Sequence, residues 1–535
     1  MTLSTSTVTL APGSSRTYTL APGEAVTVAT EPNCYVTVTE TPDVISSADL
    51  DGQTNVRTSI LQYKGTWTYG PYALGGTVAV AVSLSKSTSS VAVTLGSTAA
   101  AVVGAAIQSA VWGGNKNSVL VIGDSWGGRH YSASAQAWTY ADIGAITWAQ
   151  ALSGQRLNIV SPEAALGGTT SADWANGRLA TYLSGDSPGW VVCFLGVNDI
   201  ANDVPLETTK NNLQAVYAAC LARGCRLIIC NVPPYGPTYV VSGASLATKN
   251  ANRALLNEWI ANYVAAHSNC WLIDQFSALV SPTDTSGYMV SANSDDTVGT
   301  PGLHSTATGA RVVGALIAAI FNANGVFDSN IHASSYIDSY DYDTNSRNRI
   351  SNPLMLGSGG STSPGAGTTI VGTVVPQNWT VASLAGTSTT TVTTPARTVS
   401  NDGDVIGNNC RMSIAGAAAG ELISLRSGSI SSRFAQGDLI VGEAFVRVSS
   451  ASGLKGVRLL AQSVQGGVTY TATGMSFPAS GYKYDNSNAL LVIKTPPLLI
   501  GAGALSGHVL TLDVAFASAG GAIVDVGRVS WRKVN

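Results

Sequence analysis

Charged residues are scarce in this chain of 535 residues: Asp, Glu, Lys and Arg together make up 11%, and the formal net charge is −3. An average domain has roughly 25% charged residues, so much of the solvated surface must come from Ser, Thr, Asn and Gly. No cluster of basic residues is present, and a nucleic-acid partner is therefore not expected. The hydrophobic content of 45% is nevertheless ample for folded cores.

Long hydrophobic runs are also missing. No uninterrupted apolar segment reaches the ~18 residues of a membrane span, and the nearest candidate, residues 99–112, contains Gln108 and Ser109. We interpret this Ala-rich stretch as a helix packed on a core. The first residues, Met1 to Thr5, show neither a basic region nor an apolar core, so no secretion signal is expected.

The seven cysteines are an odd number, and none stands at a spacing from histidine that indicates zinc. The sequence therefore predicts no metal site. Cys193 and Cys230 lie in apolar runs, where buried thiols are expected. Cys220 and Cys225 are close enough in sequence to pair, which the sequence leaves open.

The pattern of residues changes twice along the chain. The first part alternates Thr and Val, and repeats Thr-Leu-Ala-Pro-Gly at residues 9–13 and 19–23, which predicts strands ending in turns. The middle part alternates apolar runs with helical stretches, which predicts a parallel sheet covered by helices. The last part returns to short alternating strands after a Gly/Ser-rich segment. We therefore predict an N-terminal β-rich module, a central α/β domain, a connector and a C-terminal antiparallel β-sandwich, at residues 1–115, 116–325, 326–368 and 369–535.

The most informative motif is Gly123-Asp124-Ser125, which ends the apolar run of residues 118–122. The run predicts a buried strand, and the glycine allows a sharp turn after it. Open α/β sheets bind ligands at the carboxyl ends of their strands. Ser125 is therefore a candidate nucleophile, and it needs a base to take its proton. A histidine can do so near neutral pH.

Three further motifs follow in order, Leu166-Gly167-Gly168-Thr169-Thr170, Phe194-Leu195-Gly196-Val197-Asn198-Asp199 and Pro301-Gly302-Leu303-His304. With the Ser125 motif, they resemble the four blocks of the SGNH (GDSL-type) hydrolases over roughly residues 117–325. The resemblance implies a flavodoxin-like three-layer α/β/α domain that needs no metal or organic cofactor. It also implies catalysis by Ser125 and His304, with an oxyanion hole formed by Ser125 N–H, Gly167 N–H and the Asn198 side-chain amide. Gly168 is adjacent, so the position of this glycine could be shifted by one residue.

The sequence departs from the family at one position. An aspartate usually precedes the histidine by three residues and orients the imidazole, whereas Pro301 stands there. Three interpretations stay open: Asp295 or Asp296 reaches the ring from the preceding loop, a backbone carbonyl orients it in a Ser–His dyad, or the site is degenerate. We favour an active dyad or a displaced acid, because the other blocks are intact.

Gly123 to Gly127 also fits G-x-S-x-G, the nucleophile elbow of α/β-hydrolases. That fold places several strands and an oxyanion loop before the serine. The first 115 residues show no strand–helix alternation, and the elbow would leave Gly196 to Asp199 unexplained, so we favour the SGNH interpretation. Trp126, Trp174 and Tyr235 lie near the predicted catalytic edge, where they could stack on a sugar ring or pack in the core.

The order of modules resembles phage tail fibre or tailspike deacetylases, which remove acetyl groups from bacterial surface polysaccharides. This resemblance predicts an O-acetyl esterase in a virion tail, or an extracellular enzyme, assembled as a homotrimer. The C-terminal sandwich would then bind carbohydrate or serve only for trimerisation, which the sequence leaves open. Two alternatives stay open. One is a non-catalytic glycan-binding or receptor-binding tail protein with a degenerate hydrolase domain, and the other is a lipase or thioesterase.

Overall fold

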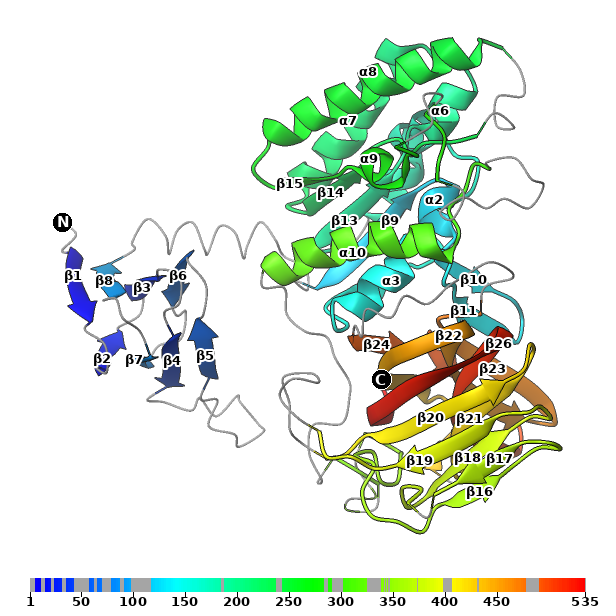
Figure 1. Ribbon diagram of the computed structural model, residues 1–535. Helices are drawn as coiled ribbons and strands as arrows, with labels where there is room; N and C mark the ends of the chain where they lie inside the picture. The colour runs from blue at the N-terminus through cyan, green and yellow to red at the C-terminus, as the bar shows by residue number, and fades with distance from the viewer. Residues whose placement is uncertain are drawn as a thin grey trace. The chain divides into compact units, whose positions relative to one another are not determined.

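The computed structural model of the chain divides into two compact units, residues Met1–Gly113 and Gly114–Asn535 (Figure 1). In the first unit it describes eight strands by their backbone. In the second it describes residues 117–534 except 184–186, 237–242, 283–286, 291–301, 325–337, 341, 343, 345–346, 373, 398–406, 431–432 and 478–489. The helix predicted at residues 99–112 lies outside the described residues.

The N-terminal unit contains two four-stranded sheets, with strand orders β1-β8-β3-β6 and β2-β7-β4-β5, and every pair in them is antiparallel. β1 and β2 end at Leu10 and Leu20, each two residues before the Pro-Gly of its copy of the sequence repeat. The β-rich character predicted for this part is confirmed. The strands are β1 (Thr5–Leu10), β2 (Ser15–Leu20), β3 (Glu24–Thr30), β4 (Tyr35–Pro42), β5 (Arg57–Leu61), β6 (Gly65–Tyr69), β7 (Val78–Lys86) and β8 (Val91–Ser97).

The centre of the second unit is a five-stranded sheet with the order β12-β9-β13-β14-β15, in which every pair is parallel. Figure 1 shows α7 and α8 on one face of this sheet and α3 and α10 on the other. The predicted three-layer α/β/α architecture is therefore confirmed. The strands are β9 (Ser118–Gly123), β12 (Asn158–Val160), β13 (Trp190–Phe194), β14 (Arg226–Cys230) and β15 (Cys270–Ile273).

The helices of this layer structure range from single turns beside the sheet edge to long covering helices. They are α2 (Ser125–Gly128), α3 (Ala145–Leu152), α4 (Ser171–Asp173), the π-helix η1 (Trp174–Arg178), α5 (Leu179–Tyr182), α6 (Val197–Ala201), α7 (Leu206–Ala222), α8 (Leu246–Ala265), α9 (Gln275–Leu279) and α10 (Ala307–Ala323). None of the described helices is both long and apolar enough to cross a membrane.

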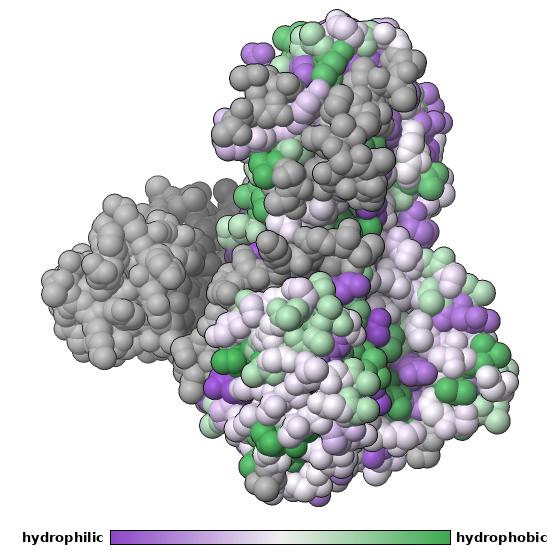
Figure 2. All heavy atoms as spheres, turned by 45° about the vertical axis from the view of Figure 1, so that its right-hand side comes forward, coloured by the Kyte–Doolittle hydropathy of each residue, from purple (hydrophilic) through white to green (hydrophobic). Residues whose placement is uncertain are grey.

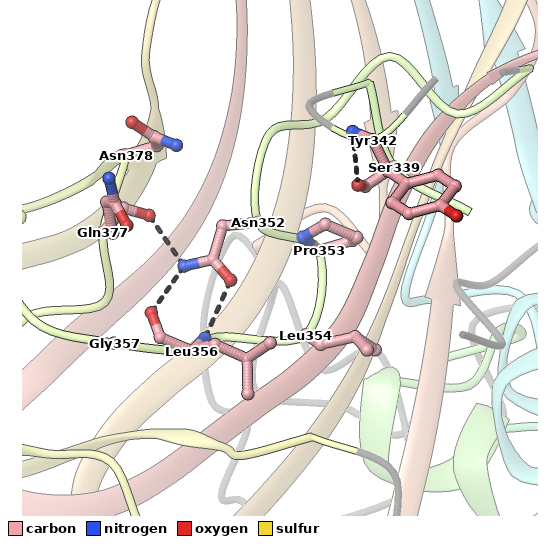
Figure 3. A pocket seen from close by; sticks show the side chains of 9 residues that line it. All are labelled: Ser339, Tyr342, Asn352, Pro353, Leu354, Leu356, Gly357, Gln377 and Asn378. Carbon is pink, nitrogen blue, oxygen red and sulfur yellow. Dashed lines mark hydrogen bonds between the residues drawn. The ribbon is translucent and has the colours of Figure 1, made fainter. Parts of the chain in front are cut away.

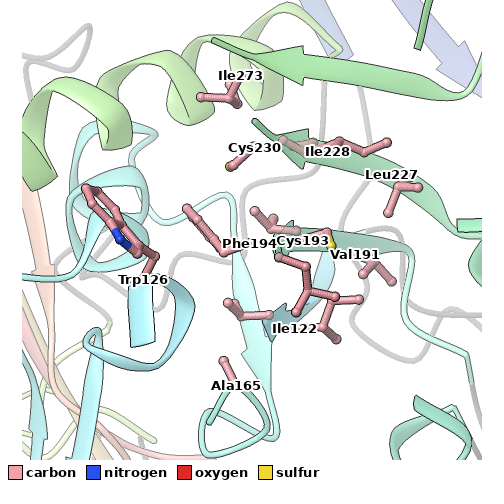
Figure 4. Close-up of a cluster of buried hydrophobic side chains, with 14 of the residues drawn as sticks. Ile122, Trp126, Ala165, Val191, Cys193, Phe194, Leu227, Ile228, Cys230 and Ile273 are labelled. Atoms are coloured by element: carbon pink, nitrogen blue, oxygen red, sulfur yellow. The ribbon is translucent and has the colours of Figure 1, made fainter. Parts of the chain in front are cut away.

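The core of the α/β part forms around the central strands (Figure 4). Every residue of β9 and β13 is buried, because helices cover both faces of a parallel sheet. This is why the two segments are continuous apolar runs in the sequence. The six described cysteines are all buried and free, so Cys220 and Cys225 do not form a disulfide in the structure.

The C-terminal region is built on two long strands, β22 (Leu439–Gln465) and β26 (Leu505–Lys533), which pair antiparallel over most of their length. The pairing shifts register between Ser449 and Gly456, where bulges bend the strands. The sequence predicts separate short strands here, and the structure joins them across the bend. The other strands are β16 (Ser361–Ser363), β17 (Thr369–Val371), β18 (Trp379–Ser383), β19 (Thr389–Thr393), β20 (Cys410–Ala417), β21 (Leu422–Ser427), β23 (Val468–Gly474), β24 (Leu490–Lys494) and β25 (Leu498–Leu499).

The surface of this unit reflects the low charge of the sequence. On the face drawn in Figure 2, the described residues are mostly pale, and the green and purple patches are small and separate. A surface of this kind is what a chain rich in Ser, Thr, Asn and Gly provides.

A hairpin of the α/β part extends the C-terminal sheet. β10 (Tyr131–Ala133) and β11 (Ala137–Tyr140) follow α2, and β11 pairs parallel with β23. Trp148 and Ala310, from α3 and α10, belong to the same buried cluster as the C-terminal strands. The C-terminal core therefore extends to helices α3 and α10 of the α/β part, and both parts belong to one compact unit, whereas the sequence predicts separate domains.

Asp142 lies at this junction and is 4% exposed. The Ser476 hydroxyl donates to Asp142 Oδ1 at 3.0 Å, while Asp142 O accepts from Trp148 Nε1 at 2.6 Å. Burial raises the pKa of Asp142 to about 7, although the hydrogen bond from Ser476 lowers it. Between these two pKa values, the folded protein therefore holds a proton on this carboxyl that the unfolded chain, in which the pKa is 3.8, has released.

We expect Asp142→Asn to change the pH dependence of stability. The contribution of protonated Asp142 is complete below pH 4 and is lost as the pH rises towards 7, because the unfolded chain releases this proton above its pKa of 3.8 while the folded state still holds it. The amide of the variant cannot ionise, so between pH 5 and pH 8 the variant should gain roughly 2–3 kcal/mol relative to the parent. Urea unfolding at both pH values measures this gain. Glu207→Gln, at an exposed glutamate, is the control, and an equal effect of Asp142→Asn at both pH values would contradict the prediction.

Candidate active site

The turn after β9 sets the position of Ser125. Gly123 has φ +137°, a conformation that favours glycine, and a Cβ there would lie 2.1 Å from Phe194 O. Asp124 N donates to Phe194 O at 2.9 Å, and the Asp124 carboxylate caps α2 by accepting from Trp126 N at 2.9 Å. The chain therefore turns tightly against β13, and Ser125 becomes the first residue of α2 at the carboxyl edge of the sheet.

His304 Nε2 lies 2.7 Å from Ser125 Oγ. The two residues are 179 positions apart in the sequence and come from opposite ends of the α/β part. His304 is placed by the start of α10, whose N-cap residue Thr306 accepts from Gly309 N at 3.4 Å. The pair has the geometry that proton transfer from the hydroxyl to the imidazole requires.

The second and third motifs converge on the same edge through hydrogen bonds to the Ser125 turn. Leu166 N and Thr169 Oγ1 both donate to Gly123 O, at 2.9 and 3.0 Å. Asn198 Nδ2 donates to Thr169 O at 2.9 Å and is buried. A Cβ at Gly167 would lie 3.6 Å from Ser125 Cβ, which puts this glycine beside the serine. The oxyanion role of Gly167 and Asn198 stays a prediction.

Asp199 is a residue whose role the sequence did not reveal. Its carboxylate accepts from Ser171 N at 2.9 Å and from Ser171 Oγ at 2.5 Å, and it is fully buried. It therefore ties the helix that bears Asn198 to the start of α4, directly after the Gly167 loop. The only sequence signal was its place next to Asn198.

Burial also changes the protonation of the carboxyls around the site. It raises the pKa of Asp124 to about 8 against the hydrogen bond from Trp126 N, and the nearby Asp199 raises it further. Burial likewise raises the pKa of Asp199. Burial therefore favours the neutral form of Asp124 in the turn that holds the nucleophile.

The candidate acids, Asp295 and Asp296, lie outside the described residues, as does Pro301. The three interpretations of what orients His304 therefore stay predictions. Within the described part of the chain, no group of three or more His, Cys, Asp or Glu residues could hold a metal ion.

The aromatic residues near the catalytic edge pack in the core. Trp126, Trp174 and Tyr235 are 5%, 0% and 0% exposed. Figure 4 shows Trp126 among the buried side chains around Phe194. Of the two roles that the sequence left open for these residues, the structure favours packing over stacking on a sugar.

Residues 121–312 match the model of the GDSL-like Lipase/Acylhydrolase family. The central domain is similar to the GDSL-like hydrolases. The match begins within β9 and ends within α10, so it includes Ser125, Gly167, Asn198 and His304. It includes neither the N-terminal unit nor the C-terminal β region.

Solved structures similar to this chain include three esterases or lipases. A GDSL-like lipase from Bacteroides thetaiotaomicron is 17% identical, with 39% of this chain and 89% of that chain covered and a TM-score of 0.30. A carbohydrate esterase family 3 protein from Talaromyces cellulolyticus is 15% identical, covering 39% and 97%, with a TM-score of 0.29. A psychrotrophic esterase from Pseudoalteromonas sp. is 19% identical, covering 39% and 98%, with a TM-score of 0.27. No curated protein matches this chain.

Proposed function

We propose that the GDSL-like domain is a serine esterase that uses Ser125 and His304. The 2.7 Å separation of His304 Nε2 and Ser125 Oγ is the observation that carries this proposal. Ser125 Oγ attacks the ester carbonyl carbon while His304 takes the hydroxyl proton, and the resulting oxyanion accepts from Ser125 N–H, Gly167 N–H and Asn198 Nδ2. The tetrahedral intermediate then expels the alcohol, to which His304 returns the proton.

The acyl-enzyme is hydrolysed by the same groups. Water attacks the acyl carbonyl while His304 takes one of its protons, and the second tetrahedral intermediate releases the acid and Ser125, which regains its proton from His304. No step requires a redox change or an added cofactor. The hydrogen bonds of Asp199 and Thr169 hold Asn198 in place beside the Ser125 turn throughout.

For the substrate we propose O-acetyl groups on a bacterial surface polysaccharide, with the protein acting in a virion tail or extracellularly as a homotrimer. The support is architectural. The GDSL-like domain is one part of a longer chain that has a β-rich unit before it and a large β region after it. Such flanking modules are suited to attachment and polymer binding, and the low charge of the surface suits a neutral glycan.

The first test compares 4-nitrophenyl acetate with 4-nitrophenyl butyrate, and then measures acetate release from O-acetylated bacterial polysaccharide. We expect turnover of both aryl esters with a preference for acetate, and acetate release from the polymer. Ser125→Ala provides the matched blank for each assay. Activity that rises with acyl length would indicate a lipase or thioesterase. Failure of all three substrates to exceed the Ser125→Ala blank would favour the non-catalytic binding protein.

A further inference from the structure

A pocket of about 430 Å³ lies in the C-terminal β region (Figure 3). Its volume is within the roughly 300–1,000 Å³ typical of small-molecule sites. None of its lining residues comes from the GDSL-like match at residues 121–312, so it is separate from Ser125 and His304. It is lined by Ser339, Tyr342, Asn352, Pro353, Leu354, Leu356, Gly357, Gln377 and Asn378.

One wall of the pocket is held together by Asn352, whose side chain makes three hydrogen bonds. Its Oδ1 accepts from Leu356 N at 2.8 Å, and its Nδ2 donates to Leu356 O and Gln377 O, both at 2.8 Å. The backbone oxygen of Asn352 accepts from Trp379 Nε1 at 3.0 Å. Two loops that are 25 residues apart are therefore joined into one wall, and the buried Trp379 anchors them to the core.

The backbone of the same wall is left-handed at two lining residues, Asn352 and Asn378, with φ of 52° and 69°, a conformation that asparagine adopts more readily than most residues. Met355, which lies between them in sequence but does not line the pocket, has φ of 57°, where its side chain is strained. Met355 is fully buried, so the surrounding core keeps it in this conformation. Strained backbone that is held in place by its surroundings occurs preferentially at binding sites, where it shapes a preorganised surface.

The rim of the pocket indicates what it binds. Tyr342 is 70% exposed, which is unusual for a large aromatic ring, and Gln377 and Asn378 are also exposed. In Figure 3, Tyr342 lies on one side of the pocket and Gln377 and Asn378 lie on the other, with Asn352 and Pro353 between them. The ring offers an apolar face at low entropic cost, and amides both donate and accept hydrogen bonds.

We propose that this pocket is a second, non-catalytic site that binds an uncharged sugar ring of a polysaccharide. A pyranose has an apolar face of C–H groups that packs on an aromatic ring, and hydroxyls at its edge that pair with amides. All nine lining residues are uncharged, so a phosphate or a carboxylate would bury its charge without a counter-charge from the lining. The proposal is independent of the esterase activity, because it involves none of the proposed catalytic residues.

The test measures binding to the full chain carrying Ser125→Ala, so that no ester is hydrolysed. Isothermal titration calorimetry is run with hexamers of glucose, xylose, mannose and N-acetylglucosamine, and with a hexamer of galacturonate as the charged comparison. We expect at least one neutral hexamer to bind at millimolar concentration and the galacturonate hexamer to bind more weakly. Absence of binding by every neutral hexamer, or preference for the charged one, overturns the proposal.

The location of binding is tested with matched variants in the Ser125→Ala background. Tyr342→Ala should raise the Kd of the bound hexamer about tenfold or more, whereas Tyr342→Phe, which keeps the ring, should change it less than about threefold. Gln377→Ala should also raise the Kd, and Leu499→Ala, at an exposed apolar residue outside the pocket, should not. Circular dichroism and melting temperature establish that each variant is folded. Unchanged affinity in the folded Tyr342→Ala variant overturns the proposal.

Discussion

His304→Ala is expected to lower kcat for 4-nitrophenyl acetate by about 10⁴-fold or more, and adding Ser125→Ala is expected to lower it no further. A nucleophile and its base act as a unit, so removing either one removes the same chemical step. The 2.7 Å contact between His304 Nε2 and Ser125 Oγ is the physical basis of this expectation. Steady-state kinetics of the two single variants and the double variant measure it.

The control for this series is His267→Ala. The His267 ring stacks on Tyr263 and its Nδ1–H donates to Tyr263 O at 2.7 Å, just after the end of α8. This variant should keep the activity of the parent. If His304→Ala retained more than a tenth of the parent kcat, another group would be the base and the assignment of His304 would be wrong. If the double variant were far slower than both single variants, the two residues would act independently.

The α/β fold could be predicted because its signal is local. Strands of a parallel sheet are buried on both faces, so β9 and β13 are continuous apolar runs that can be recognised without any knowledge of their partners. Two of the helices that cover them begin at recognisable caps, α8 at Ser245 and α10 at Thr306.

The joining of the two parts of the second unit could not be predicted, because it depends on contacts between distant residues. Asp142 and Ser476 are 334 positions apart, and neither residue type indicates the other. The hairpin that follows α2 is short, and nothing in its own sequence indicates that its strand β11 pairs in parallel with β23. Ile350 and Met355 likewise lie in residues 326–368, which the sequence predicts as a connector, but they are buried in the C-terminal core.

The pairing of Ser125 with His304 was implied by the resemblance to the SGNH hydrolases, and it agrees with the rule that open α/β sheets bind ligands at the carboxyl ends of their strands. The residues that support them were not accessible in this way. Thr169 and Asp199 act through hydrogen bonds to Gly123 O and to Ser171, and the sequence does not say where a threonine hydroxyl or a carboxylate points. The candidate reacting groups of the site could therefore be named from the sequence, whereas the contacts that support them were found only in the structure.

Asn198→Ala is expected to lower kcat about 10²- to 10³-fold, the range observed when one oxyanion donor is removed. Asn198 Nδ2 donates to Thr169 O at 2.9 Å, and Thr169 in turn donates to Gly123 O in the Ser125 turn. This chain fixes the plane of the Asn198 amide, and therefore the direction of its second N–H. Because the oxyanion exists only during reaction, KM should change little while kcat falls.

Two measurements separate this role from a structural one. Asn198 is buried and hydrogen-bonded, so its loss is also expected to cost about 1–3 kcal/mol of stability, and assays are run well below the melting temperature of the variant. Asn202→Ala is the matched control, because Asn202 is exposed and lies four positions after Asn198, at the end of α6. This variant should retain the parent kcat. A folded Asn198→Ala variant with the kcat of the parent would assign the oxyanion hole to backbone N–H groups alone, because the charge that develops on the carbonyl oxygen would then be stabilised without the side-chain amide.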